Sequence, residues 1–242
     1  MTAPPAPNGV FLTAQWRALA MLNYPISPAV LLPRVPAGCE LDFFRGDAFV
    51  SIVGFRFLNV HVLGFPIPFH RDFDEVNLRF YVRHRADDGE WRRGVVFVKE
   101  IVAKGAIAFV ARTFYGENYV QHSMRSRVEL PGHLRYAWHH RGRWESITAT
   151  TSGESDFTPD DSEETFITEH YWGYAKQRDG GAMEYAVEHP RWRVWHCDTV
   201  DFRCDVAKLY GPEFAEALSG PPSSAFVADG SEVVVRRGRR VT

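Results

Sequence analysis

Three polar residues of different chemistry occupy alternate positions in the segment FDEVNLRFYVRHR, residues 73–85: Glu75, Asn77 and Arg79. Successive side chains of a β-strand point to opposite faces, so this spacing predicts a strand with one polar face. The intervening positions are apolar and belong to a core face. The polar face lies either in solvent or against the inside of a barrel wide enough to hold a ligand, where it forms a binding surface.

A second candidate group lies in the stretch GVVFVKEIVAKGAIAFVARTFYGENY. An apolar strand precedes apolar residues at helical spacing, which predicts a helix over about 103–115 that ends at Gly116. Arg112, near the end of this helix, suits a carboxylate partner or an anionic substrate, and it equally suits the negative end of the helix. Glu117 and Tyr119 follow the glycine, where they act as a general acid or base or are ordinary loop residues.

Other chemistry finds less support in the sequence. Lys99 and Lys104 are amines that can form a Schiff base if their pKa is lowered, but lysines are more commonly on the surface. Lys99 also faces away from its strand neighbour Glu100. His139 and His140 are adjacent and point to opposite faces of a strand, which does not suit one metal. There is no phosphate loop, dinucleotide fingerprint or serine elbow, so we predict no cofactor and no metal.

Composition limits the class of protein. The 242 residues are 45% hydrophobic, which is enough for a substantial core, and 28 basic residues balance 30 acidic ones. This balance gives no reason to expect nucleic acid or a membrane as a partner. The three cysteines suit a reducing compartment. With no apparent signal peptide, we expect a cytoplasmic protein that takes a small-molecule ligand, and the sequence is compatible with a homo-oligomer. Residues 1–9 are expected to be a loose tail and residues 236–242 to be frayed.

Short strand-like segments separated by turn signals fill most of the chain. Hairpin turns are predicted at 45–47, 178–181 and 229–230. The first helix is predicted over about 13–22, and the remaining helices are few and short. Many hairpins and few helices predict a mainly β fold in which an antiparallel sheet closes, or nearly closes, into a barrel. We expect residues 1–242 to form a single domain.

The chain resembles a known family along most of its length. The resemblance rests on FDEVNLRFYV, RGVVFVKEIV and ARTFYGENY, together with the N-terminal WRALAMLNY and LLPRVPAGCELDFFRGDAFVSIVGF. These motifs, in this order, are similar to the YqjF-like family of bacterial proteins, which more distantly resembles the acetoacetate decarboxylase-like superfamily. The resemblance implies a mainly β, antiparallel, barrel-like fold around a central cavity, with few helices.

The resemblance also has consequences for the site. In the decarboxylases a strand carries a glutamate that reaches the cavity, and Glu75 matches that position. An aromatic–glycine turn then leads to a pair of lysines, the first of which forms the Schiff base. Here the pair falls on Tyr119 and Val120, and neither side chain is an amine. A Schiff-base decarboxylase is therefore not supported.

Three hypotheses remain. The first is an enzyme, lyase-like in activity, that uses Glu75, Arg112, Glu117 and Tyr119 for acid–base or enolate chemistry on a small carbonyl or carboxylate compound. The second is a non-catalytic binder of a small acidic metabolite, and the third is an interaction protein with a vestigial cavity. We expect the four residues to converge on one enclosed pocket, with Arg112 as the counter-charge of Glu75. A paired Glu75 stays ionised, whereas desolvation alone raises its pKa.

Overall fold

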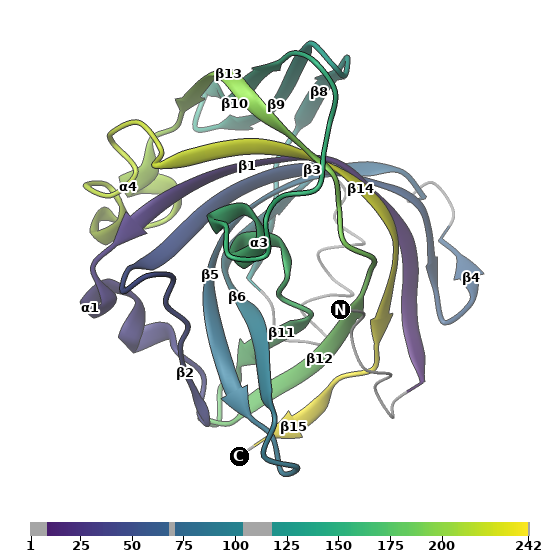
Figure 1. The fold of residues 1–242 in the computed structure, drawn as a ribbon, viewed down its shortest axis with the longest axis vertical. Helices are drawn as coiled ribbons and strands as arrows, with labels where there is room; N and C mark the ends of the chain where they lie inside the picture. The colour runs from purple at the N-terminus through teal and green to yellow at the C-terminus, as the bar shows by residue number, and fades with distance from the viewer. Residues whose placement is uncertain (1–8, 68–70, 104–117, 242) are drawn as a thin grey trace.

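Strands dominate the computed structural model, which describes residues 9–67, 71–103 and 118–241 (Figure 1). They belong to one sheet of 15 strands. The strands are β1 (Val10–Ile26), β2 (Cys39–Leu41), β3 (Ala48–Val62), β4 (Phe65–Pro66), β5 (Phe73–Arg85), β6 (Trp91–Val102), β7 (Tyr119–Gln121), β8 (Met124–Val128), β9 (His133–His140), β10 (Arg143–Thr151), β11 (Trp172–Lys176), β12 (Ala182–Glu188), β13 (Val194–Arg203), β14 (Ser224–Arg236) and β15 (Arg239–Val241). The mainly β prediction is confirmed.

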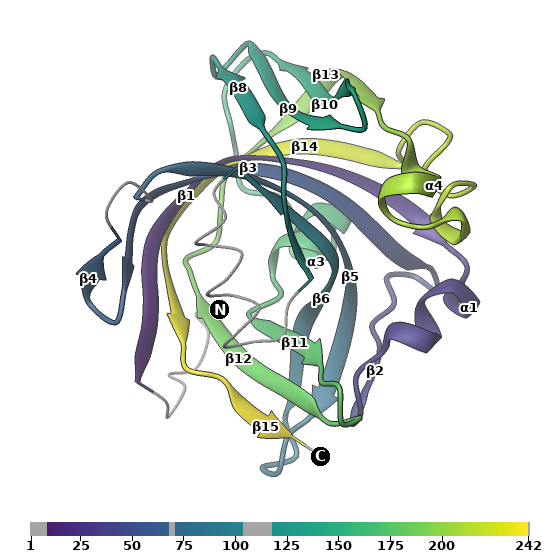
Figure 2. The ribbon, with the colours of Figure 1, turned by 180° about the vertical axis from the view of Figure 1, so that it is seen from behind.

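The long strands form a closed ring around an interior. Their order is β12-β11-β6-β5-β3-β1-β14, and β14 returns to pair with β12, where Val187 lies opposite Val235. Figures 1 and 2 show these strands curving around the middle of the molecule. Closure leaves few open strand edges. Most pairings are antiparallel as predicted, but β7 and β11 both pair with β6 in parallel.

The strands β13, β10, β9 and β8 continue from β14 and fold over the outside of the ring as a second layer (Figure 2). The two layers approach closely at Gly54 of β3, where an added Cβ would lie 2.7 Å from the ring of Tyr136. The hydroxyl of Tyr136 donates a hydrogen bond to the carbonyl oxygen of Ala18 in β1, at 2.9 Å. A large apolar core fills the space between the layers.

Strand β5 is buried on both faces. Its even-numbered residues, from Val76 to Val82, belong to the core between the layers, as the alternation predicts. Its odd-numbered residues face the interior of the ring, where Phe73 and Tyr81 join a second apolar core. Glu75, Asn77 and Arg79 lie between them on this inner face and are also buried. The polar face therefore faces inward and not solvent.

Two local predictions were wrong, for reasons visible in the packing. The segment 13–22 is not a helix but part of β1, which is buried on both faces over much of its length, so its apolar residues do not alternate. Asp229 and Gly230 do not form a hairpin, because β14 runs through them. Gly230 has a φ of +81°, and an added Cβ would lie 2.0 Å from the carbonyl oxygen of Trp16. This close approach to β1 explains the glycine.

The C-terminal end of the described chain also differs from expectation. Arg239–Val241 are not frayed but form β15, which pairs with β12.

The turn predicted at 45–47 is present, since Phe44 and Asp47 form an isolated bridge, but β2 pairs with β5 and not with β3. The hairpin predicted at 178–181 connects β11 and β12 as expected.

The described helices are short. They are α1 (Pro28–Leu31), α3 (Glu163–Thr168) and α4 (Val206–Leu209), with 3-10 turns η1 (Leu32–Arg34) and η2 (Pro212–Phe214). Ser162 caps α3 by accepting a hydrogen bond from the backbone N–H of Thr165, at 3.1 Å. None of these described helices has the length and apolar character needed to cross a membrane. The predicted helix over 103–115 falls almost wholly outside the described residues.

Candidate functional site

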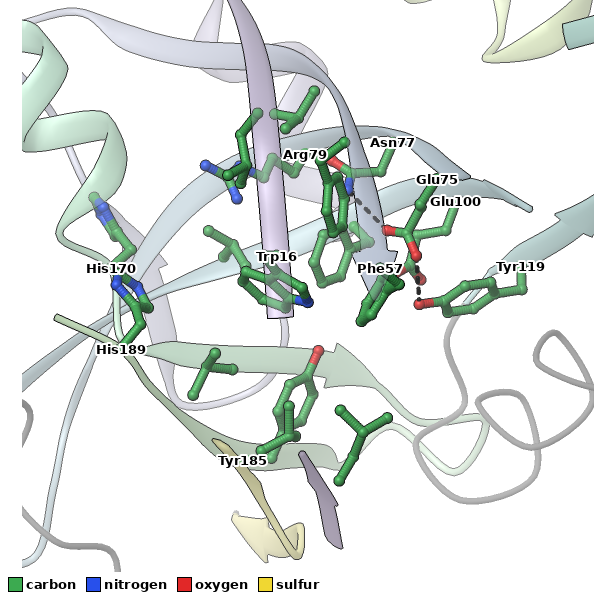
Figure 3. Close-up of a pocket in the computed structure, with 18 of the residues that line it drawn as sticks. Trp16, Phe57, Glu75, Asn77, Arg79, Glu100, Tyr119, His170, Tyr185 and His189 are labelled. Carbon is green, nitrogen blue, oxygen red and sulfur yellow. Dashed lines mark hydrogen bonds between the residues drawn. The ribbon is translucent and has the colours of Figure 1, made fainter. Parts of the chain in front are cut away.

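A pocket of about 120 Å³ opens inside the ring, against the inner face of β5 (Figure 3). One water molecule needs roughly 10–15 Å³ measured in this way, so the pocket has room for a small organic molecule. Its lining side chains come from β1, β3, β5, β6, β7, β11, β12 and β14, from the end of α3, and from the segments that follow β4, precede β11 and follow β12. Strands that are distant in sequence thus supply one site.

The walls of the pocket are aromatic. Trp16 contacts Phe55 and Phe57 edge-on, at ring-centroid distances of 5.4 and 5.7 Å. Phe57 stacks on Phe73 at 4.7 Å. Trp16 also lies 6.3 Å from Trp192. Such interlocked rings make a rigid apolar surface, which is typical of pockets that bind small molecules.

Glu75 is the polar centre at one end of the pocket and is only 2% exposed. The Tyr119 hydroxyl donates a hydrogen bond to Glu75 Oε2 at 3.2 Å, and Asn77 Nδ2 donates one to Glu75 Oε1 at 3.0 Å (Figure 3). Glu100 of β6 lies opposite Asn77 on β5 and opposite Tyr119 on β7. The parallel pairing of β6 with β7 therefore places Tyr119 beside the inner face of β5.

Burial controls the proton affinities of this group. Desolvation raises the pKa of Glu75 from 4.5 to about 7, against the opposing effects of the hydrogen bonds from Asn77 and Tyr119 and the positive charge of Arg79. Desolvation, with the nearby charges of Glu100 and Glu75, raises the pKa of Tyr119 well above 10. Near neutral pH, Glu75 can therefore gain and lose a proton, while Tyr119 keeps its own.

The opposite end of the polar face carries a cation and two histidines. Arg79 is 8% exposed, and its Nη2 donates a hydrogen bond to the carbonyl oxygen of Ile167 at 3.3 Å. His170 Nε2 lies 3.1 Å from Asp42 Oδ2, and His189 stacks on Trp192 at 4.1 Å. Burial lowers the pKa of both histidines to about 4, so both are uncharged near neutral pH.

Of the four residues predicted to converge on one pocket, the described structure brings two together. Glu75 and Tyr119 meet, although 44 positions separate them in sequence. Arg112 and Glu117 lie outside the described residues, and their roles stay predictions. Sequence reasoning missed three residues that line the pocket: Glu100, His170 and His189. The histidines lie in loops that no local pattern orients, and His189 is held there by stacking on Trp192.

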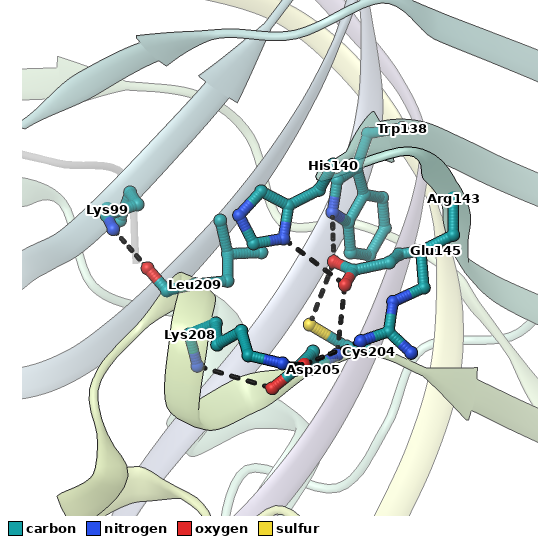
Figure 4. Close-up of polar contacts among 9 residues, drawn as sticks. All are labelled: Lys99, Trp138, His140, Arg143, Glu145, Cys204, Asp205, Lys208 and Leu209. Carbon is teal, nitrogen blue, oxygen red and sulfur yellow. Dashed lines mark hydrogen bonds and ion pairs between the residues drawn. The ribbon is translucent and has the colours of Figure 1, made fainter.

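The lysines do not supply an amine to the described pocket. None of the described side chains that line it is a lysine. Lys99 lies on the other face of β6, where its ammonium donates a hydrogen bond to the carbonyl oxygen of Leu209 (Figure 4). Lys104 lies outside the described residues.

Another buried carboxylate, Glu145, lies on β10 in the outer layer (Figure 4). It accepts hydrogen bonds from Trp138 Nε1 at 2.9 Å, from the backbone N–H of Asp205 at 3.0 Å and from Cys204 Sγ at 3.3 Å. His140 Nδ1 lies 3.3 Å from the same carboxylate. These contacts satisfy its oxygens and tie the start of α4 to β9 and β10, so the group is structural. Among the residues that the structure describes, no cluster of His, Cys, Asp and Glu is arranged to hold a metal ion.

Solved structures show the same fold. The acetoacetate decarboxylase from Legionella pneumophila has a TM-score of 0.67 and 14% identity, covering 100% of this chain and 92% of that one. The enduracididine biosynthesis enzyme MppR, complexed with pyruvate, has a TM-score of 0.67 and 12% identity, covering 99% of this chain and 93% of that one. At such identities the likeness shows the fold alone. The prediction of an acetoacetate decarboxylase-like fold is confirmed.

Sequence comparison gives a nearer relative. The uncharacterized protein YqjF of Bacillus subtilis (strain 168) is 27% identical over 195 residues, which covers 76% of this chain and 76% of the relative. Residues 13–232 match the family DUF2071, described as an uncharacterized conserved protein. This match includes the described polar residues that line the pocket and all of the ring strands except the first three residues of β1 and the last four of β14. The chain therefore belongs to the DUF2071 family.

Proposed function

We propose that the pocket binds a small carbonyl or carboxylate compound and that Glu75 exchanges a proton with it. The observation that carries this proposal is a carboxyl group buried among aromatic rings, with a pKa of about 7, held between Asn77 and Tyr119. A general acid–base group works best when its pKa lies near the working pH. Among the pocket's described carboxyl groups, Glu75 combines burial with a pKa raised into the neutral range, which suits it to exchange a proton.

The proposed step is proton abstraction next to a carbonyl group. The ionised Glu75 takes a proton from the carbon beside the carbonyl carbon, and the electron pair of that C–H bond moves to the carbonyl oxygen as an enolate. Return of the proton from Glu75 restores the starting compound. Tyr119 keeps its proton and holds the Glu75 carboxylate in place. The indole N–H of Trp16 is buried in the pocket wall and has no acceptor among the described residues, so it is available to the enolate oxygen. In this proposal Arg112 and Glu117 remain candidates for additional charged groups.

Structural neighbours support a carbonyl compound, and the sequence indicates how it would react without an amine. Proteins of the same fold are described as an acetoacetate decarboxylase and as an enzyme complexed with pyruvate. Since Tyr119 stands where the resemblance requires the lysine, the proposed chemistry uses a carboxyl group in place of a covalent amine. Proton transfer of this kind needs neither a Schiff base nor a second reactant.

A non-catalytic binder is the second candidate function. The rigid aromatic walls favour it as much as they favour an enzyme, because they bind a ligand whether or not a proton moves. The two functions differ in what Glu75 does. For an enzyme, Glu75→Gln removes turnover and leaves binding, whereas for a binder it changes affinity alone.

The test uses the uncharged ketone 2-hexanone in D2O. Binding is followed through the fluorescence of the pocket tryptophans, and exchange of the protons next to the carbonyl is followed by proton NMR. We expect the wild-type protein to accelerate exchange and Glu75→Gln to bind the ketone without accelerating it. Equal exchange with both proteins, with binding intact, would favour the binder. Absence of both binding and exchange would contradict the proposed function.

A further inference from the structure

Arg79 is a buried cation for which the described part of the chain supplies no ion-pair partner. Its Nη2 has two neutral contacts, the carbonyl oxygen of Ile167 at 3.3 Å and the sulfur of Met21 at 3.9 Å. Its Nε is buried and has no acceptor in the part of the chain that the structure describes. A buried charge is costly unless an opposite charge accompanies it, so this arrangement needs a reason.

The groups around Arg79 do not supply that anion. His170 and His189 have pKa values of about 4, lowered mainly by burial, with smaller effects of Arg79 on both and of Arg93 on His170, so they are neutral at pH 7. The carboxylate of Asp42, beyond His170, is already paired with Arg93 Nε at 2.7 Å. Glu75 feels the charge of Arg79, but its oxygens accept hydrogen bonds from other residues and it is only partly ionised at this pH.

Other polar atoms of the pocket are also unsatisfied. Asn77 Oδ1 and His170 Nδ1 are buried and, among the described residues, have no hydrogen-bond partner. Both residues line the same pocket as Arg79. Buried polar atoms are nearly always hydrogen-bonded, so a group of them around one pocket indicates the positions of ligand atoms. Figure 3 shows Arg79, Asn77 and Glu75 following one another along β5.

We propose that Arg79 is the binding subsite for the carboxylate of a ligand whose carbonyl end lies at Glu75. This inference rests on the proposed function and specifies its substrate class. The guanidinium binds a carboxylate by charge-assisted hydrogen bonds, which are stronger than those to a neutral group. His170 donates its Nε2–H to Asp42, so its Nδ1 is an acceptor and suits a donor group of the ligand and not the carboxylate. Asn77 Oδ1 lies between the two ends and accepts a hydrogen bond from a donor on the middle of the ligand.

The spacing along β5 sets the length of the ligand. Four residues of a strand span roughly 13 Å between backbone positions, and the two side chains bridge only part of this distance. The carboxylate therefore lies several bonds from the carbon that loses its proton, in contrast to a ligand whose carboxylate is attached to the reacting carbon. One guanidinium beside neutral histidines supplies a single positive charge, which matches a carboxylate better than a doubly charged phosphate.

The experiment compares three probes of equal length: hexanoate, 5-oxohexanoate and the uncharged 2-hexanone. Binding to the wild-type protein, Arg79→Met and Arg79→Lys is measured by calorimetry, with inorganic phosphate as a fourth probe. Arg83→Met is the matched control, because Arg83 lies on the same strand but is half-exposed and paired with Glu40. We expect 5-oxohexanoate to bind the wild type about 10- to 100-fold more tightly than 2-hexanone does, as expected for hydrogen bonds to a charged group. Arg79→Met should remove this preference, Arg79→Lys should retain part of it, and Arg83→Met should leave it intact.

The outcomes separate this inference from the proposed function. Binding of hexanoate that depends on Arg79, without proton exchange on any ketone, supports the subsite and contradicts the proposed function. Equal binding of 5-oxohexanoate and 2-hexanone, or failure of both anions to bind, overturns the subsite. Tighter binding of phosphate than of 5-oxohexanoate also overturns it, since the subsite is assigned to a carboxylate. The melting temperature of Arg79→Met gives an independent check: it should not fall, because the substitution removes an unpaired buried charge, and a loss of several degrees would show that the charge is paired.

Discussion

Replacing Glu75 by glutamine should stabilise the protein by an amount that grows as the pH rises from 4.5 to about 7 and changes little above that. The pKa of Glu75 is about 7 in the folded state, against 4.5 without burial. Between these pH values the folded state holds a proton that the unfolded state lacks, so the wild-type fold loses stability as the pH rises. The difference corresponds to about 3 kcal/mol of unfolding free energy, at 1.36 kcal/mol per pKa unit. Glutamine does not titrate and avoids this loss.

The assay is urea denaturation followed by tryptophan fluorescence, on wild type and Glu75→Gln, between pH 5 and pH 8. The variant should gain about 1 kcal/mol at pH 5 and about 3 kcal/mol at pH 8, with an unchanged dependence on urea. Glu232→Gln is the control, because Glu232 is an exposed residue of β14 and its removal should give no pH-dependent gain. If the variant is less stable than wild type at pH 8, Glu75 is ionised and paired with a cation. Arg112 is the cation that the sequence led us to expect in that role.

Three further predictions concern the same site. Tyr119→Phe should raise the pKa of Glu75, because the hydrogen bond that it removes lowers that pKa; the midpoint of the stability–pH curve should move upward, and an unmoved midpoint would contradict the contact. In the Glu75→Gln background, the free energy of unfolding should fall as the pH is lowered from 6.5 to about 4, because in that range His170 and His189 take up protons in the unfolded state but not in the folded state. Adding His189→Gln should make this pH dependence weaker, and an unchanged dependence would place His189 in solvent. Borohydride treatment with acetoacetate should leave no adduct by mass spectrometry, and a mass increase at Lys99 would contradict the absence of Schiff-base chemistry.

The local pattern predicted β5 well because its two faces differ in chemistry. Alternation identified the apolar outer face and the polar set of Glu75, Asn77 and Arg79. The same reasoning failed for β1, because a strand that is buried on both faces carries apolar residues in succession, and some of these also fit helical spacing. At Gly230 the usual turn signal has another cause, the close approach of β1 to β14.

The candidate site shows where local pattern stops being informative. The meeting of Tyr119 with Glu75 depends on the parallel pairing of β7 with β6, which no spacing in the sequence specifies. The position of Glu75 was indicated by resemblance and alternation together, whereas His170 reaches the pocket from a loop. Among the described residues Arg79 has no ion-pair partner, because the carboxylate of Asp42, on the far side of His170, is already paired with Arg93. Such an arrangement is a property of the folded interior and not of local sequence.

The pH dependence of proton exchange on 2-hexanone tests the central claim most directly. If Glu75 is the base, the rate of exchange in the presence of wild-type protein should rise with pH, with a midpoint at about 7, and level off above it. Glu75→Gln should give only the buffer rate at every pH. A wild-type rate that equals the buffer rate throughout, or one that Glu75→Gln reproduces, would contradict the account.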